Sequence, residues 1–246
     1  MQIASNSDVG EPEATAAQPH QWEESYRRHL SRYEDFTNHL RDLLEDLLKN
    51  ANIDVIQIDG RAKSAESFAE KVRRKGAQYD DPLRQVTDLV GLRVITYYLE
   101  DVSRVGDLVR DEFAVDPVNS VDKADMATPE QFGYRSVHYV ATLGPNRRDL
   151  AEWAPFRSVR FEVQVRTSFQ HAWAAVDHKL RYKTAKDVPN DLKRRLYRLG
   201  ALFELADEQF SELRDASPTE SGRATAVRCG RGISERLWTP SHSRPT

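Results

Sequence analysis

The sequence predicts an α+β domain in which a mixed β-sheet of about four to five strands is flanked by helices. Residues 158–167 alternate apolar and polar side chains, as a half-buried strand does. Residues 90–99 (VGLRVITYYL) form a short, largely apolar run that is typical of a buried strand. Around these strands, leucine and aromatic residues recur at helical three-and-four spacing, so helices and strands alternate along one chain.

The predicted elements follow one another closely. Helices are expected at residues 22–50, 64–75, 101–113, 169–180 and 192–213, with a short helix opening at residues 80–82. Strands are expected at residues 53–58, 90–99, 134–142 and 158–167. Asp59-Gly60 predicts a turn out of the first strand, and Ser64 is placed to cap the second helix.

The composition also predicts where the domain begins and ends. Residues 1–20 are small, polar and proline-containing and show no helical or strand period, so we expect a disordered lead there. Residues 21–215 hold every predicted element. Residues 216–246 are rich in Ser, Pro, Gly, Thr and Arg, with five Arg against two Glu (5 − 2 = +3), and we expect them to form a disordered tail.

Several classes of protein are excluded by the same composition. The chain has 246 residues and a formal charge of −3, and no run approaches the roughly 18 apolar residues of a membrane helix. Its single cysteine, Cys229, excludes an intrachain disulfide framework and a cysteine-based zinc site. Residues 1–20 lack the basic and apolar regions of a signal peptide. We therefore expect a cytoplasmic protein that does not contact membranes, and the acidic balance argues against general binding of duplex nucleic acid.

A strongly basic segment runs from Gly60 to Gly76. Six Lys or Arg residues stand there against two Glu residues, a local charge of +4 (6 − 2) in an acidic protein. Arg61, Lys63 and Ser67 surround the predicted helix start, where free N–H groups and the helix dipole favour phosphate. Lys71 follows Ser67 by four residues, on the same helix face. An ordinary solvated helix with a capping serine would look similar, so this segment alone leaves both interpretations open.

Two carboxylates are candidates to complete a phosphate site. Asp88 lies just before the strand at residues 90–99, and Glu162 lies in mid-strand on a polar face shared with Gln164 and Arg166. Mg²⁺ commonly takes two carboxylate ligands from protein and fills its shell with water and phosphate. A helix-ending aspartate and a structural ladder of ion pairs are the alternatives when each residue is considered alone.

The segment FGYRSVH (residues 132–138) follows the longest polar loop. Gly133 lets a ligand approach the backbone, and Tyr134 is able to stack on a base, although an exposed aromatic on a strand is the alternative. His171 and His178 are seven residues apart on one helix face. No third ligand at zinc-like spacing accompanies them in the sequence, so we expect packing or hydrogen-bonding roles.

Four motifs occur in order: RAKSAES (61–67), TDLVGLR (87–93), GYRSVH (133–138) and EVQVRT (162–167). Together they closely resemble the synthetase domain of RelA/SpoT-type alarmone synthetases, and HAWAAVDHKLRYK (171–183) resembles the small, stand-alone members. The resemblance covers about residues 25–212. It implies a nucleotidyltransferase-like fold and Mg²⁺-dependent transfer of pyrophosphate from ATP to the 3′-hydroxyl of GDP or GTP.

The resemblance implies a role for each matching residue. Arg61 and Arg93 would stack on the two faces of the adenine. Asp88 and Glu162 would hold Mg²⁺, and Glu162 would also accept the proton of the attacking hydroxyl. Tyr134 would stack on the acceptor guanine. The ATP phosphates would be held by Lys63, Ser67 and Lys71. The remaining acceptor-side residues are Lys123, Arg135, His138, Gln164 and Arg166.

The chain departs from the family pattern in two places. The loop before Gly133 carries Pro129-Glu130-Gln131-Phe132 where a basic element is common, which leaves Lys123 as the nearest lysine. Toxic small relatives transfer pyrophosphate to the 3′ end of tRNA, and this loop is compatible with that alternative. Too little chain precedes Trp22 for the family's hydrolase domain, so we expect synthesis without hydrolysis. The sequence leaves open an inactive nucleotide-binding module, a homo-oligomer and an antitoxin partner.

Overall fold

The computed structural model describes residues 18–75, 78–122, 136–183 and 190–217. The chain divides into a main unit, residues 1–211, and a C-terminal unit, residues 212–246, of which residues 212–217 are described and residues 212–216 belong to the last helix. The first helix begins at Gln18, so residues 18–20 of the expected lead are helical. Residues 1–17 and 218–246 lie outside the described part. Within the described residues, no helix combines the length and apolarity needed to cross a membrane.

Helices and strands alternate along the described chain. The helices are α1 (Gln18–Asn50), α2 (Ala65–Lys75), α3 (Pro82–Gln85), α4 (Leu99–Glu112), α5 (Pro145–Arg148), the 3-10 helix η2 (Ala151–Phe156), α6 (Ser168–Lys183) and α7 (Asn190–Ala216). The strands are β1 (Val55–Ala62), β2 (Val90–Thr96), β3 (Phe113–Val115), β4 (Val121–Asp122), β5 (Val137–Leu143) and β6 (Phe161–Thr167).

The strands form one mixed sheet in the order β1-β2-β6-β5-β3, and β4 also pairs with β5. The central pair, β2 and β6, is parallel, while the pairs β1–β2, β5–β6, β3–β5 and β4–β5 are antiparallel. This arrangement confirms the predicted class, a mixed sheet with flanking helices. Parallel pairing aligns the starts of β2 and β6, which brings the segments around Asp88 and Glu162 together.

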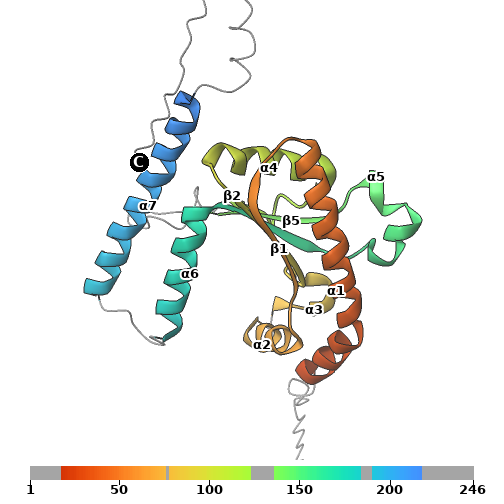
Figure 1. Cartoon of the computed structure of the whole chain (residues 1–246). Coiled ribbons are helices and arrows are strands. Elements are labelled where there is room, and N and C mark those ends of the chain that lie inside the picture. Colours follow the sequence, from red (N-terminus) through yellow and green to blue (C-terminus); the bar gives the residue numbers. More distant parts are fainter. Residues whose placement is uncertain (1–17, 76–77, 123–135, 184–189, 218–246) are drawn as a thin grey trace, which may run out of the picture. The chain divides into compact units, whose positions relative to one another are not determined.

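One face of the sheet is apolar and is covered by α1 and α4. Its core residues include Leu92 on β2 and Phe161 and Val163 on β6, which belong to one cluster with Phe36 and Leu40 of α1. Figure 1 shows α1 running along the sheet, with α2 and α3 near its N-terminal part. Because this face is filled by aliphatic and aromatic side chains, polar residues on alternate positions of the same strands must point to the other face.

One sequence prediction about the strands was wrong, and two short strands were missed. Asp59-Gly60 does not form a turn, because β1 continues to Ala62 and Gly60 pairs with Leu92. A Cβ at Gly60 would lie 2.8 Å from Thr37 Cγ2, so the glycine permits close packing of α1 on the strand. The short strands β3 and β4 were not predicted, because two or three residues are too few to show a period.

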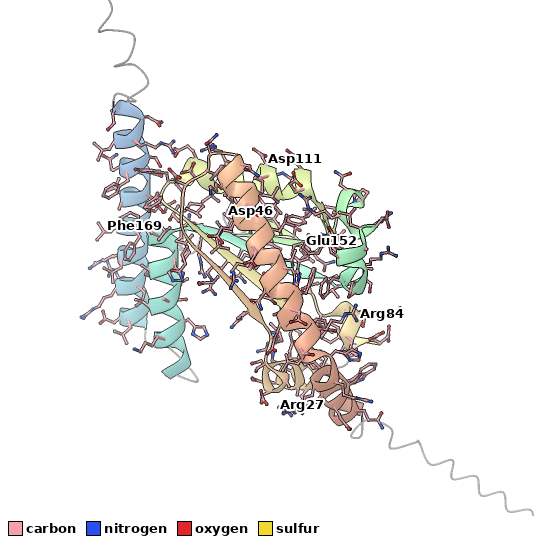
Figure 2. The ribbon with its side chains drawn as sticks, turned by 45° about the vertical axis from the view of Figure 1, so that its right-hand side comes forward. Arg27, Asp46, Arg84, Asp111, Glu152 and Phe169 are labelled. Carbon is pink, nitrogen blue, oxygen red and sulfur yellow. The ribbon has the colours of Figure 1, made fainter. Side chains whose placement is uncertain are left out.

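Helices α6 and α7 contact each other through aromatic rings. The Phe169 ring, labelled in Figure 2, lies 6.0 Å from the Phe203 ring and 5.5 Å from the Phe210 ring. A buried hydrogen bond, 2.7 Å from Thr167 Oγ1 to Asp207 Oδ2, joins the end of β6 to α7. These contacts fix the start of α6 against the last helix.

Candidate active site

The second face of the sheet carries polar side chains in two rows, which we call the polar face. The first row is Arg61, Gly91 and Glu162, and the second is Asp59, Arg93, Gln164 and His138. In-register neighbours point to the same side of a sheet, so each row crosses β1, β2 and β6. A Cβ at Gly91 would meet nothing nearer than the Arg61 carbonyl oxygen, at 4.0 Å. A side chain at position 91 would therefore have room between Arg61 and Glu162.

Asp88 lies directly before β2 and is held by two lysines. Lys63 Nζ lies 2.9 Å from Asp88 Oδ2, and Lys71 Nζ donates a 2.8 Å hydrogen bond to Oδ1. The Lys63 backbone is fixed in turn, because its N–H donates to Leu89 O and its carbonyl accepts from the Tyr26 hydroxyl, both at 2.8 Å. Burial alone would raise the pKa of Asp88, but the hydrogen bonds and charges of the two lysines hold that pKa below its ordinary value.

Helix α2 begins beside this cluster. The Ser67 N–H donates to Ser64 Oγ at 3.2 Å, which confirms the predicted cap, and the Ser64 hydroxyl donates to Ser67 Oγ at 3.0 Å. Lys63 precedes the cap and Lys71 follows it along the helix, and both reach Asp88. The helix N-terminus and two ammonium groups therefore gather in one place, as phosphate binding requires.

Glu162 lies in the middle of β6 and contacts a histidine from β5. His138 Nδ1 is hydrogen-bonded to Glu162 Oε1, and Gln164 Nε2 donates to the same oxygen at 3.3 Å. His138 Nε2 lies 2.8 Å from Ser136 Oγ, so both ring nitrogens are engaged and the ring orientation is fixed. Burial would raise the pKa of Glu162, but the hydrogen bond and charge of His138 outweigh it, and the pKa lies below its ordinary value.

The parallel register places Glu162 opposite Gly91, three residues after Asp88, and the charge of Asp88 acts to raise the pKa of Glu162. Two neighbouring carboxylates supply hard oxygen ligands of the kind that Mg²⁺ takes from proteins. No group of three or more His, Cys, Asp or Glu side chains suited to a metal occurs within the described residues. Because Mg²⁺ commonly takes only one or two carboxylates from protein, Asp88 and Glu162 fit a cation that completes its shell with phosphate and water.

Three arginines lie on the polar face at different positions: Arg61 in the first row, Arg93 in the second, and Arg166 beyond it toward the end of β6. Arg93 Nε is buried and has no hydrogen-bond partner among the described residues, while Arg61 is exposed on β1. Arg166, on β6, is 7% exposed. His171, in the first turn of α6, faces the same charges, because burial and the nearby Arg166 and Arg93 lower its pKa.

His171 was not among the sequence-predicted site residues, and Ser136 was not singled out within its motif. The sequence carried one usable signal for His171, since α6 directly follows β6 and its first turn must lie beside the end of that strand. Of the predicted acceptor-side residues, the structure describes His138, Gln164 and Arg166. The others, Lys123, Tyr134 and Arg135, lie outside the described residues.

Known proteins resemble this chain in sequence and in fold. The family model described as a region found in RelA / SpoT proteins matches residues 60–187. Two Bacillus subtilis (strain 168) proteins are similar in sequence. GTP pyrophosphokinase YjbM is 32% identical over 158 residues, 64% of this chain and 71% of that protein. GTP pyrophosphokinase YwaC is 29% identical over 151 residues, 61% of this chain and 69% of that protein.

Solved structures show the same fold. The crystal structure of the small alarmone synthetase 1 from Bacillus subtilis bound to its product pppGpp superposes with a TM-score of 0.65 at 27% sequence identity. The match covers 80% of this chain and all (100%) of that one. The polar face thus belongs to a fold that, in that relative, binds a guanosine nucleotide.

Proposed function

This chain belongs to the RelA/SpoT family, and we propose that it is a GTP/GDP diphosphokinase that transfers pyrophosphate from ATP to the 3′-hydroxyl of GDP or GTP in the cytoplasm. The observation that carries the proposal is the convergence of Lys63 and Lys71 on Asp88, next to Glu162. Cations for a polyphosphate and two carboxylates for a divalent ion are the parts that phosphoryl-type transfer needs. The named GTP pyrophosphokinases among its relatives support the same reaction.

On the donor side, the proposal assigns ATP to the region between β1, α2 and β2. Arg61 and Arg93 would stack on the adenine through their flat guanidinium groups. The phosphates would be held by Lys63, Ser67 and Lys71. Asp88 and Glu162 would hold Mg²⁺, which when bound neutralises phosphate charge. With the lysines drawn to the phosphates, Asp88 would be released from its present partners.

At the acceptor, Glu162 would take the proton of the ribose 3′-hydroxyl. The hydroxyl oxygen attacks the β-phosphorus of ATP, the bond from that phosphorus to the α,β-bridging oxygen breaks, and AMP leaves. His138 keeps the Glu162 carboxylate ionised and oriented through its hydrogen bond. Lowering of the Glu162 pKa also limits its strength as a base, so positioning of the hydroxyl contributes much of the rate. Acceptor binding would involve Lys123, Tyr134, Arg135, Gln164 and Arg166.

One experiment separates the candidate acceptors. The chain is incubated with ATP labelled in the β- and γ-phosphates, Mg²⁺, and GDP, GTP or deacylated tRNA in parallel reactions. We expect a 3′-pyrophosphorylated guanosine nucleotide and unlabelled tRNA, since a relative binds pppGpp as its product. Labelled tRNA alone would favour the tRNA-modifying alternative, and no labelled product would favour an inactive binding module. Persistence of the labelled product during long incubation tests the further proposal that this chain does not hydrolyse it.

We also propose that the chain pairs with a second copy of itself through α7. Leu192, Leu199, Leu202 and Leu205 are between 44% and 61% exposed, an apolar stripe that monomers rarely leave uncovered. The first half of α7 carries the basic residues Arg194, Arg195 and Arg198, and the second half carries the acidic residues Glu204 and Glu208. An antiparallel, two-fold pair of α7 helices would place each basic half against an acidic half.

Light scattering at increasing concentration tests this pairing. We expect a dimer or larger even-numbered assembly that Leu199→Glu combined with Leu202→Glu converts to monomer. Ser31→Glu, which adds a charge to an exposed position of α1, should leave the assembly intact. A chain that remains monomeric at every concentration would overturn the pairing and leave the stripe for another partner, such as an antitoxin.

A further inference from the structure

A basic pocket of about 280 Å³ lies where α1, α3 and the residues leading into β6 meet. Four basic side chains line this cavity, which we call the basic pocket: His29, Arg32, Arg84 and Arg160. Figure 2 labels Arg84 on the short helix α3, beside α1. None of the residues proposed above to bind ATP or a metal lines this pocket, so the proposed reaction gives its charges no role.

The arginines of the basic pocket are weakly compensated. Arg84 Nε lies 3.4 Å from Asp81 Oδ2, and Arg160 lies 3.8 Å from Asp116 Oδ2, which is beyond hydrogen-bonding distance. Asp116 is already engaged by its own loop, with hydrogen bonds from the Asn119 side chain at 2.8 Å and the Val118 N–H at 3.0 Å. The negative charge of Asp116 is therefore partly offset by these donors, and it compensates the charge of Arg160 only weakly.

Arg32 contributes a guanidinium to the basic pocket that is buried at one nitrogen. Its Nε is buried without a hydrogen-bond partner among the described residues, and one terminal nitrogen donates to the Pro155 carbonyl oxygen. A backbone carbonyl does not neutralise a guanidinium, and within the described residues Arg32 forms no ion pair with an acidic side chain. An anion entering the pocket would supply the missing charge.

Hydroxyl donors and apolar walls complete the basic pocket. Tyr33, 7% exposed, contributes a phenol that burial keeps protonated by raising its pKa, and Ser158 contributes a second hydroxyl. Leu83, Leu89 and Val159 supply the apolar wall. Guanidinium groups and hydroxyls are the donors that recognise phosphate oxygens, and aliphatic walls suit the body of an organic phosphate.

We propose that the basic pocket binds a small phosphate-bearing anion. Its volume lies near the lower limit of ligand pockets, which suits pyrophosphate or a small phosphorylated metabolite. Leu89 directly follows Asp88, and Arg160 lies two residues before Glu162, so a bound anion would brace the starts of the two parallel strands that carry the catalytic carboxylates. The site is independent of whether the chain transfers pyrophosphate.

Calorimetry on the full chain tests the basic pocket. Inorganic pyrophosphate and ribose 5-phosphate are titrated separately, with a non-hydrolysable ATP analogue and GDP present at saturation to occupy the proposed active site. The variants are Arg84→Ser and Arg160→Ser, and the matched control is Arg41→Ser, because Arg41 is exposed on α1, pairs with Asp42 and does not line the pocket. Circular dichroism and thermal melting verify that each variant is folded.

We expect at least one of the two anions to bind the wild-type chain and the Arg41→Ser variant with equal affinity. Arg160→Ser should weaken that binding by about tenfold or more, the effect of losing one charge-assisted contact. Arg84→Ser should weaken it less, because the Arg84 side chain is 88% exposed. Tighter binding of pyrophosphate identifies an inorganic ligand, and tighter binding of ribose 5-phosphate identifies an organic one. Absence of binding by both anions, or equal affinities in all four proteins, would overturn the proposal. If the wild-type chain binds the anion but transfers no pyrophosphate, the proposed function is rejected and the proposal of this anion site still holds.

Discussion

The two carboxylates that we propose to be catalytic are held in different ways on the two halves of the polar face, which we call the donor and acceptor halves after the nucleotides proposed to bind there. Asp88, on the donor half, has each of its oxygens next to a lysine ammonium, and both lysines come from the segment between β1 and the end of α2. Glu162, on the acceptor half, contacts His138 from an antiparallel neighbouring strand, with Ser136 behind the ring.

This difference indicates on which half the carboxylate can exchange its hydrogen-bond partners when a ligand binds. Lysine side chains are flexible point charges and can move from a carboxylate to a phosphate without a change in the backbone. The ring of His138 is fixed at both nitrogens, so Glu162 keeps its orientation while its surroundings change. We infer that the donor half rearranges when ATP enters and that the acceptor half is already in place.

Replacing Glu162 should give the largest effect on transfer. Glu162→Gln preserves shape but removes the negative charge and the proton acceptor, so we expect the transfer rate to fall by at least about a hundredfold. Nucleotide affinity, measured by calorimetry without turnover, should change little. Transfer within tenfold of the wild-type rate would reject the assignment of Glu162.

Replacing Lys71 should sharpen the contrast between the halves. Lys71→Met removes one of the two ammonium groups on Asp88, so we expect the nucleotide-free chain to bind Mn²⁺ more tightly, as measured by electron paramagnetic resonance. The same change should weaken ATP binding by about tenfold through the lost charged contact. Lys75→Gln, at the exposed end of the same helix, is the control. Unchanged Mn²⁺ affinity would show that the lysine does not compete with the metal.

The sequence was sufficient to predict the fold class and to select the residues of the candidate site, but not the contacts between them. Glu162 was identifiable because β6 alternates strictly, and the start of α2 because of its serine cap. The contact of Lys63 with Asp88 joins residues 25 apart in sequence (88 − 63), and no local period encodes it. His138 meets Glu162 only through the antiparallel register of β5 and β6, which depends on the whole sheet.

The prediction of a turn at Asp59-Gly60 was wrong for a related physical reason. Local composition favoured a turn there, but the close approach of Thr37 on α1 requires a residue without a side chain in the middle of β1. Tertiary packing therefore places Gly60, a residue type that is typical of turns, inside a strand. As a result β1 reaches Ala62 and carries Asp59 and Arg61 on the polar face.

Replacing Arg61 should have a smaller effect that is confined to the donor half. Arg61→Ala removes one of the two guanidinium groups proposed to stack on the adenine, an interaction of about 1 kcal/mol at an exposed site. We expect ATP affinity to fall by about fivefold while GDP affinity stays the same, as measured by calorimetry for each nucleotide separately. Arg74→Ala, on the exposed end of α2, serves as the control. Equal ATP affinity in the wild type and Arg61→Ala would contradict stacking.

The smallest expected effect is on stability and concerns the donor half without any ligand. The pKa of Asp88 is lower in the folded chain than its ordinary value of 3.8, so its ion pairs stabilise the fold above that pH and stop doing so as pH falls through the lower, folded pKa. Asp88→Asn should therefore be less stable than the wild type at pH 7, and the difference in unfolding free energy from urea denaturation should shrink below about pH 4. Asp42→Asn, at an exposed position that pairs with Arg41, should show little difference from the wild type at neutral pH. A difference for Asp88→Asn that stays constant down to pH 3 would mean that the two lysines do not stabilise the ionised carboxylate, and the donor half would then hold Asp88 by shape alone.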